Sequence, residues 1–311
     1  MRVRNILLAA FLGLLLPWLL LLAVEPDYEQ EEPTQPVPVE TSSMTVAVLL
    51  ENGAITEMEL EEYLLGVVLA EMPASFEYEA LKAQAVVART FTCKSILSSK
   101  HPEAAVCTRA SCCQAYISQE RYLKNGGQAG SVERIKRAVT DTAGQVLLYD
   151  GELIVATYFS CSGGRTEDAV AVWGTDVPYL QATDSPGEEQ ATHYMDTVSF
   201  TVQEFETLLG GKFGSIGEVT YTDGSGVDTI FIADTQYTGI ELRQKLGLRS
   251  TAFTISFAND TVTVTTKGYG HRVGMSQYGA NAMAENGNSY EQILYYYYKG
   301  THLGQISEMM V

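Results

Sequence analysis

Basic residues are scarce in this chain of 311 residues. It has 20 Lys and Arg against 38 Asp and Glu, so its formal net charge at neutral pH is −18. Proteins that bind nucleic acids concentrate Lys and Arg on one face or along one helix. The sequence has no such basic stripe, which argues against a nucleic-acid-binding protein. Bulk charge of this sign also does not draw the chain to an anionic surface.

Histidine and cysteine are also few. The chain has four His, and the metalloprotease pattern H-E-x-x-H does not occur, which argues against a catalytic zinc peptidase. An odd number of cysteines, five, leaves one thiol unpaired and fits a complete disulfide framework poorly. The sequence also shows no internal repeat.

The long apolar run of the sequence lies near its start. Residues 6–24 form 19 apolar positions without a charge, which is long enough to cross a bilayer as a helix. Arg2 and Arg4 precede this run, so we expect a cytoplasmic N-terminus and the rest of the chain on the outer side of the membrane. A cleaved signal peptide is the alternative, but the run lacks an A-x-A-like site and is longer than usual. We predict an uncleaved single-pass transmembrane anchor within residues 1–24.

Residues 25–43 have a different composition. They hold six acidic residues and several prolines but no Lys or Arg, which predicts a solvated tether rather than a folded segment. Anchor and tether together contribute −4 to the net charge and leave −14 on residues 44–311. These 268 residues suffice for one large domain or two small ones.

Two helical patterns surround Glu71. Apolar residues at positions 60, 64, 67 and 68 predict a helix that stops at Met72-Pro73, because proline cannot continue it. A second helix is expected from about Glu77 to Ile96. A helix C-terminus and an apolar setting both disfavour an ionised carboxylate, so the pKa of Glu71 should rise. Such a group suits general acid catalysis. An exposed carboxylate at a helix end is the alternative.

A cluster of possible metal ligands follows the second helix. His101, Cys107, Cys112 and Cys113 lie within sixteen residues, and thiolate and imidazole are the usual ligands of a structural zinc ion. A disulfide is one alternative, because the segment is expected outside the cytoplasm, and free thiols are another. The adjacency of Cys112 and Cys113 makes Cys112 the weakest ligand candidate.

A predicted hairpin leads to a loop of small residues. Two β-rich runs at 145–160 are joined by Asp150-Gly151, a strong hairpin signal. Small residues after a strand let the backbone approach a ligand, and a following basic side chain can hold it; a tight turn is the alternative. The loop consists of Ser160, Cys161, Ser162, Gly163, Gly164 and Arg165. Beyond it, we expect Glu167 to be structural and Trp173 to lie in the core.

The C-terminal half mixes helix and strand signals, and the expected fold class is α+β. Residues 196–267 form a sub-region in which capping boxes open helices at 202–209 and 239–247, and alternating runs predict strands. A Gly-rich loop at 268–280, which includes His271 and Gln277, then leads into the last two helices, and Ser289-x-x-Gln292 is a capping box that opens the second of them. A lone histidine such as His271 is usually structural.

Three long blocks of this sequence resemble the stage II sporulation protein D (SpoIID) family. They are LLGVVLAEMPASFEYEALKAQAVVARTF, YFSCSGGRTEDAVAVWGTDVPYL and YGHRVGMSQYGANAMAENGNSYEQILYYYYKGT, in this order. Members of the family are membrane-anchored lytic transglycosylases that cut peptidoglycan strands stripped of stem peptides. They act in a complex that helps the mother cell to engulf the forespore. The resemblance therefore implies a SpoIID-like catalytic body over residues 44–311.

The resemblance also implies roles for single residues. The family's catalytic Glu, in the tripeptide EMP, is Glu71 here, acting as a single general acid/base. Arg89 would orient Glu71 or a sugar. The expected glycan groove comprises Ser160, Ser162, Gly163, Gly164, Arg165 (where relatives usually carry Lys), His271 and Gln277. A glycan-binding scaffold without essential catalysis is the alternative function.

Relatives with a similar cysteine segment hold a zinc ion with two His and two Cys. His101, Cys107 and Cys113 match that pattern, while Cys112 stands where the second His would be. The resemblance further implies two partners: a peptidoglycan amidase that makes the bare glycan and a membrane protein that localises the complex.

Overall fold

The computed structural model of the chain describes residues 44–98 and 100–309. The predicted anchor at 1–24 and tether at 25–43 lie outside these residues. Within the described residues, no helix is both long and apolar enough to cross a bilayer. The chain divides into two units, Met1–Glu40 and Thr41–Val311, and the fold described below belongs to the second.

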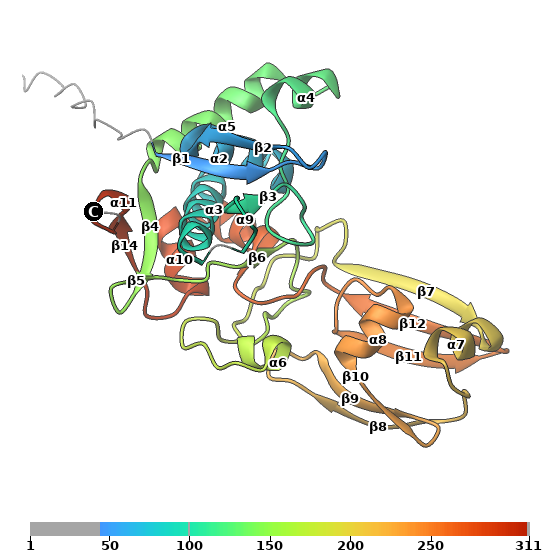
Figure 1. The fold of residues 1–311 in the computed structure, drawn as a ribbon. Coiled ribbons are helices and arrows are strands. Elements are labelled where there is room, and N and C mark those ends of the chain that lie inside the picture. The colour runs from blue at the N-terminus through green and yellow to red at the C-terminus, as the bar shows by residue number, and fades with distance from the viewer. Residues whose placement is uncertain (1–43, 99, 310–311) are drawn as a thin grey trace, which may run out of the picture. The chain divides into compact units, whose positions relative to one another are not determined.

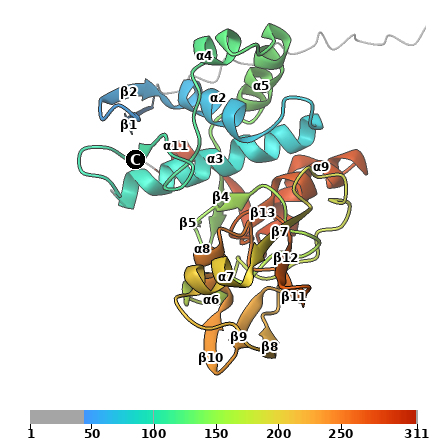
Figure 2. The ribbon, with the colours of Figure 1, turned by 90° about the vertical axis from the view of Figure 1, so that its right-hand side faces the viewer.

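The two predicted helices around Glu71 are present (Figure 1). Helix α2 spans Leu60–Glu71, and α3 spans Tyr78–Ser98. Met72 is extended and ends α2, as the following proline predicted. Helix α3 is the centre of the larger core, because it packs against α2 and against four further elements: α5 (Ala129–Asp141), α9 (Gln277–Glu285), α10 (Tyr290–Tyr297) and β4 (Gln145–Tyr149). Figure 2 shows α2 alongside α3.

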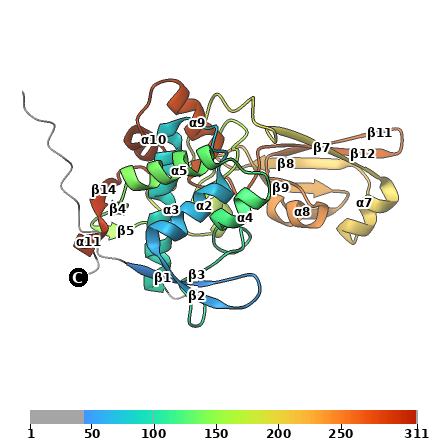
Figure 3. The ribbon, with the colours of Figure 1, turned by 90° about the horizontal axis from the view of Figure 1, so that it is seen from above.

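A small sheet precedes α2. Strands β1 (Thr45–Leu49) and β2 (Ile55–Glu59) are antiparallel, and β3 (Val106–Cys107) lies parallel to β1 (Figure 3). The pairing of β3 brings the cysteine segment back to the start of the fold. The short helix α4 (Gln119–Lys124), capped by Ser118, follows that segment and had no clear sequence signal.

The predicted hairpin at Asp150-Gly151 joins β4 (Gln145–Tyr149) to β5 (Glu152–Leu153). Strand β14 (His302–Gln305) completes this sheet on the other side of β4. The second run of the predicted hairpin leaves the sheet early. Its end, β6 (Tyr158–Phe159), pairs in parallel with β13 (Met275–Ser276), which directly precedes α9 (Gln277–Glu285). This pairing joins the two blocks that carry the predicted groove residues.

A second hydrophobic core forms within the predicted sub-region 196–267. Two three-stranded sheets, ordered β11-β12-β7 and β10-β9-β8, surround it together with two helices. The strands are β7 (Met195–Thr201), β8 (Ile216–Tyr221), β9 (Val227–Ile232), β10 (Thr235–Thr238), β11 (Phe253–Ala258) and β12 (Thr261–Lys267). Helices α7 (Val202–Leu209) and α8 (Gly239–Leu246) both begin with the predicted capping boxes.

Three further helices complete the described chain: α6 (Ala169–Trp173), α10 (Tyr290–Tyr297) and α11 (Ile306–Met309). The capping box of α10, Ser289 with Gln292, is also the predicted one. The described chain is thus a mixed fold of helices and mostly antiparallel strands, with two hydrophobic cores.

Candidate active site

A cleft of about 370 Å³ opens at the C-terminal end of α2. Its walls come from the α2–α3 connection, from α4, from the end of β6 and from the start of α9. The lining residues are Leu69, Ala70, Glu71, Met72, Pro73, Ala74, Phe76, Tyr122, Ser160, Gln277 and Tyr278. Glu71 is the single Asp or Glu among them, so one carboxyl group faces this cleft.

Neutral groups surround the Glu71 carboxyl. The backbone N–H of Ala115 donates to Oε1 at 2.6 Å, and the Tyr158 and Gln277 side chains also hydrogen-bond to the carboxyl. Burial raises the pKa of Glu71, and these hydrogen bonds lower it by less than burial raises it. The predicted rise in pKa is therefore present, with burial as its cause. The group is partly buried at a cleft wall, not freely exposed at a helix end.

Glycine at position 66 lets the Ala115 segment reach α2. The backbone N–H of Ile117 donates to the Gly66 carbonyl at 3.1 Å. A Cβ at Gly66 would meet the Tyr116 ring at 2.2 Å and the Ile117 carbonyl at 2.8 Å. Only glycine allows so close an approach, and this approach places Ala115 N–H against Glu71.

A buried polar network extends from Glu71 into the core, and sequence reasoning missed it. The Tyr158 hydroxyl donates to Gln114 Oε1 at 3.1 Å, and Gln114 Nε2 donates to Thr92 Oγ1 at 3.0 Å. Burial first, and the neighbouring Glu71 second, raise the pKa of Tyr158 well above its usual value. The phenol therefore stays protonated as a hydrogen-bond donor. These residues come from three distant segments and share no motif, so no local sequence pattern predicts their contacts.

The four predicted metal ligands meet in one place. One donor atom from each of His101, Cys107, Cys112 and Cys113 lies within 4.8 Å of all the others. His101 Nε2 is 3.2 Å from Cys113 Sγ and 3.8 Å from Cys112 Sγ. The backbone N–H groups of both Cys112 and Cys113 bond to the Arg109 carbonyl, and this tight turn lets adjacent cysteines face the same point.

This donor set fits a metal ion. In a tetrahedral site with metal–ligand distances of about 2.0–2.3 Å, donor atoms lie roughly 3.3–3.8 Å apart. The distances from His101 Nε2 to Cys113 Sγ and Cys112 Sγ, 3.2 Å and 3.8 Å, are of this size. All five cysteines are thiols in this structure. Burial raises the pKa of Cys107, but hydrogen bonds from the Arg109 backbone and from the neighbouring thiols outweigh it, and the net pKa is lowered. The cluster can therefore supply a thiolate, the form that binds metals.

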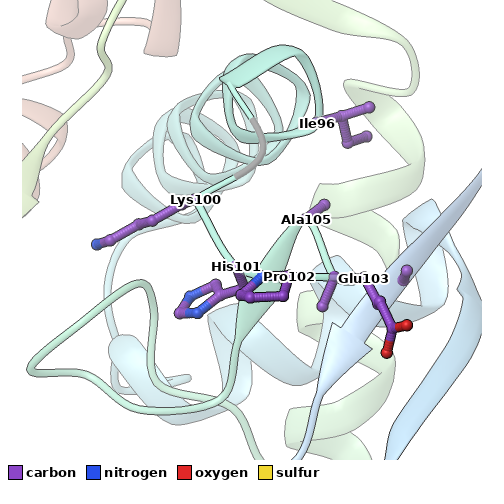
Figure 4. A pocket seen from close by; sticks show the side chains of 8 residues that line it. Ile96, Lys100, His101, Pro102, Glu103 and Ala105 are labelled. Atoms are coloured by element: carbon purple, nitrogen blue, oxygen red, sulfur yellow. The ribbon is translucent and has the colours of Figure 1, made fainter.

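A larger pocket of about 530 Å³ lies beside this cluster (Figure 4). Figure 4 shows the Lys100 and His101 side chains on one side of the segment and Glu103 on the other. The other residues that line this pocket have small or apolar side chains, such as Ala47 and Ile96. Because His101 already belongs to the metal-ligand cluster, we assign the chemistry to the Glu71 cleft despite its smaller volume.

Six of the seven predicted groove residues separate into three places, and the seventh, His271, lies elsewhere. Ser160 and Gln277 line the cleft with Glu71. Ser162 is buried and donates to the Glu188 carboxylate from its backbone N–H at 2.7 Å and its hydroxyl at 2.9 Å. Gly163, Gly164 and Arg165 line a separate pocket of about 390 Å³. The loop is thus a turn held by a buried carboxylate, and its two ends face different pockets.

The expectation that Arg89 orients Glu71 or a sugar is wrong in this structure. Arg89 is fully buried and makes a two-pronged ion pair with Glu61, from Nε at 2.9 Å and from Nη2 at 2.7 Å. Its remaining donors bond to the carbonyls of Val139 and Gln145. Arg89 therefore joins α2, α3, α5 and β4. Arg89 follows Ala85 by four residues, so it lies on the apolar side of α3, and this position already predicted its burial.

His271 does not line the Glu71 cleft. Its ring packs against Phe159 and against Trp173, and its Nδ1 accepts the Val273 N–H at 3.1 Å. Burial, with a smaller contribution from Arg243, lowers the pKa of His271 to about 4, so the ring is neutral near pH 7. Trp173 is 45% exposed, which corrects the expectation that it lies in the core.

Glu167 is structural, as expected. It is 1% exposed and pairs with the buried Arg272 guanidinium at 3.2 Å. It also accepts hydrogen bonds from the Thr222 hydroxyl and the Gly226 N–H. These contacts join the 163–167 loop, the 268–274 loop and the β8–β9 turn. Glu167 lines neither the Glu71 cleft nor the pocket at Gly163.

Comparison with known proteins identifies the family. The family model "SpoIID: Stage II sporulation protein" matches residues 51–149. Stage II sporulation protein D of Bacillus subtilis (strain 168) is 41% identical over 266 residues, 83% of this chain and 77% of that protein. The protein of the same name from Bacillus amyloliquefaciens is 38% identical over 268 residues, 83% of this chain and 78% of that protein. The amidase enhancer of Bacillus subtilis is 31% identical over 298 residues, 77% of this chain but 40% of that protein. The chain therefore belongs to the stage II sporulation protein D family.

Proposed function

We propose that this protein is a lytic transglycosylase that cuts peptide-free peptidoglycan strands, with Glu71 as its single general acid/base. One observation carries the proposal: a lone carboxyl group, with its pKa raised by burial and with neutral partners, faces a cleft. Glycosidases that use water employ two carboxyl groups, one as acid and one as base or nucleophile. A cleft with one carboxyl group suits a reaction that needs no activated water.

The reaction would proceed with one proton moving in each direction. The protonated Glu71 carboxyl gives its proton to the glycosidic oxygen as the bond from that oxygen to C1 of muramic acid breaks. The 6-hydroxyl oxygen of the same muramic acid forms a new bond to C1, and Glu71 accepts the hydroxyl proton. The products are a 1,6-anhydromuramic acid end and a free 4-hydroxyl end, and Glu71 returns to its starting form.

The structure around Glu71 supports both steps. The Ala115 N–H stabilises the carboxylate that exists between the two proton transfers. The absence of a charged partner leaves the pKa raised, so that the acid form is available for the first step. Gln277 adds another neutral contact.

We further propose that the His/Cys cluster binds a zinc ion and that this ion is structural. His101, Cys107, Cys112 and Cys113 would hold it, and four such ligands make a closed site. When bound, the ion supplies a cross-link within the segment that ends at Ala115. This segment provides the hydrogen-bond donor to Glu71, so the cross-link fixes the position of that donor.

The cellular setting follows from the family and from the reaction. Two relatives are named stage II sporulation protein D, and a third is named amidase enhancer. We propose a role in forespore engulfment, with residues 1–24 as a single-pass anchor and the catalytic domain on the outer side of the membrane. An amidase that removes stem peptides would supply the substrate, and a membrane protein would localise the complex.

The test is the identity of the product ends. Full-length wild type and Glu71→Gln are incubated with peptide-free glycan strands, and the products are identified by mass spectrometry. Anhydro ends from wild type alone support the proposal. Reducing ends would identify a hydrolase instead. Strand binding without cleavage by either protein would favour a glycan-binding scaffold.

A further inference from the structure

The pocket at Gly163 has an unusual charge for this chain. Residues 44–311 carry a net charge of −14, yet this pocket is lined by Arg165, Lys267 and Arg272 and by no Asp or Glu. It lies between the loop after β6 and the ends of β8, β11 and β12. A local excess of positive charge in an acidic domain indicates an anionic ligand.

Two of these three cations are available to a ligand. Arg272 is committed, because it pairs with Glu167 and donates to the carbonyls of Ser162, Arg165 and Gly224. The Lys267 side chain is exposed, and its ammonium group has no ion pair or hydrogen bond within residues 44–98 and 100–309.

Arg165 is partly committed. It donates from Nε to the Asp223 carbonyl at 2.8 Å and from Nη1 to the Asp184 carboxylate at 2.5 Å. Its Nη2 group has no acceptor among the described residues. Its side chain is 37% exposed, and Asp184 is 74% exposed, so that ion pair is screened by water. A ligand carboxylate can therefore share the guanidinium with Asp184.

The other walls of the pocket suit a sugar ring. Tyr221 is 59% exposed and offers a flat apolar face, on which the ring can pack. Gly163 has a φ of +77°, and a Cβ there would lie 2.9 Å from Lys267 Cβ. Glycine at this position therefore allows the loop backbone and the Lys267 side chain to come together at the pocket.

This pocket lies one short loop away from the Glu71 cleft. Ser160 lines the cleft and Gly163 lines the pocket, so their Cα atoms are separated by no more than about 11 Å. Glu188 holds the loop between them through the N–H groups of Ser162 and Gly163. The loop residues that line the two sites are thus held within a distance of one or two sugar units.

We propose that Lys267 and Arg165 bind the free lactyl carboxylate of a muramic acid residue. This inference rests on the proposed function and specifies how that site selects its substrate. In a strand that carries stem peptides, the lactyl carboxyl group is part of an amide and has no charge. The pocket therefore distinguishes peptide-free from peptide-bearing strands by the negative charge at the lactyl carboxyl position.

The test is a binding measurement on the full-length Glu71→Gln protein, in which we expect cleavage to be slower by about 10²-fold or more. Its ligands are a peptide-free tetrasaccharide with free lactyl carboxylates and the same tetrasaccharide with those groups converted to neutral methyl amides. Because charge-assisted hydrogen bonds are strong, we expect about tenfold tighter binding of the carboxylate form. Adding Lys267→Met should reduce this preference to less than about threefold. Lys212→Met, which removes one positive charge from an exposed site on the same sub-region, should leave it unchanged.

Equal loss of preference in both lysine variants would overturn the inference, because bulk charge would then explain it. Equal binding of the two ligands by the Glu71→Gln protein would also overturn it. Displacement of the glycan by a glycerol phosphate oligomer, dependent on Lys267, would reassign the pocket to phosphate polymers. These results concern binding alone, so they are independent of whether wild type yields anhydro or reducing ends.

Discussion

Glu71 and Glu167 are two partly or fully buried carboxyl groups, and burial raises the pKa of both. Their partners differ. Glu71 has neutral hydrogen-bond donors and faces a cleft, whereas Glu167 pairs with the buried Arg272 and lines neither the Glu71 cleft nor the pocket at Gly163. The Oε2 atom of Glu167 has no hydrogen-bond partner and is buried.

The comparison teaches that burial alone does not make a catalytic acid. A carboxyl group must also reach the substrate and exchange its proton without losing a fixed charge partner. Glu71 meets both conditions, and Glu167 meets neither. A variant of Glu71 should therefore lower activity and largely preserve stability. A variant of Glu167 should lower stability and largely preserve activity.

The largest expected effect is on activity. Glu71→Gln removes the proton donor, so cleavage of peptide-free strands should fall by about 10²–10⁴-fold, while the protein stays folded. The measurement is the initial rate of product formation, with circular dichroism as the control for folding. Retention of more than a tenth of the wild-type rate would show that Glu71 is not the essential proton donor.

Glu167→Gln should act on stability. The change leaves the Arg272 charge buried without a partner, so the free energy of unfolding should fall by about 3–5 kcal/mol. Chemical denaturation measures this loss. Below the unfolding temperature, the rate of strand cleavage should stay within a few-fold of wild type. A catalytic loss as large as that of Glu71→Gln, in folded protein, would break the distinction between the two carboxyl groups.

Metal removal should also lower stability. A ligand present at 100 times its Kd stabilises the folded state by about 2.7 kcal/mol, and chelation removes this contribution. The melting temperature of zinc-loaded protein should therefore fall after dialysis against a chelator. The Cys107→Ser variant should melt at the lower temperature both in the presence of zinc and after chelation. Identical melting of loaded and chelated wild type would show that the His/Cys cluster holds no stabilising metal.

Gly66→Ala tests the contact that positions Ala115. The added methyl group meets Tyr116 and Ile117, and overpacking of this kind costs about 1–3 kcal/mol. The displaced segment would also carry the Ala115 N–H away from Glu71. We expect a lower cleavage rate in protein that remains folded, while Gly130→Ala, at a glycine with open space around it and no left-handed φ, should keep the wild-type rate. Equal cleavage rates for both variants would show that the position of the Ala115 segment does not affect catalysis.

The smallest expected effect is on the pH dependence of stability. The raised pKa of Glu71 means that the folded protein holds this proton more tightly than the unfolded chain. The resulting stability is present below the unfolded pKa and is lost as the pH rises through the folded pKa. The difference between the melting temperature of Glu71→Gln and that of wild type at the same pH should therefore shift in favour of the variant as the pH rises from 4 to 8. A constant difference across this range would mean that the pKa is not raised.

Local rules predicted much of the fold around these sites. The proline after Met72 predicted where α2 ends and so placed Glu71 at a helix terminus. Three capping boxes and the Asp150-Gly151 turn predicted the starts of α7, α8 and α10 and the β4–β5 hairpin. Each of these signals depends on residues within four positions of one another.

Contacts between distant segments escaped prediction. Ala115 lies 44 residues from Glu71, and its contribution is a backbone N–H that no residue type specifies. The Glu188 carboxylate that holds the 162–163 turn, and the Arg272 that pairs with Glu167, also depend on tertiary packing. Arg89 was misassigned because its role was taken from the family resemblance, and its side of α3 was not considered.

The central claim is that Glu71 directs attack by the substrate's own hydroxyl group and not by water. Cleavage of peptide-free strands by wild type in ¹⁸O-labelled water tests it most directly. We predict anhydro-ended products without ¹⁸O, because no water enters the new bond at C1. Products with ¹⁸O at a reducing end, formed at the initial rate of cleavage, would contradict the account and require a second carboxyl group at the cleft.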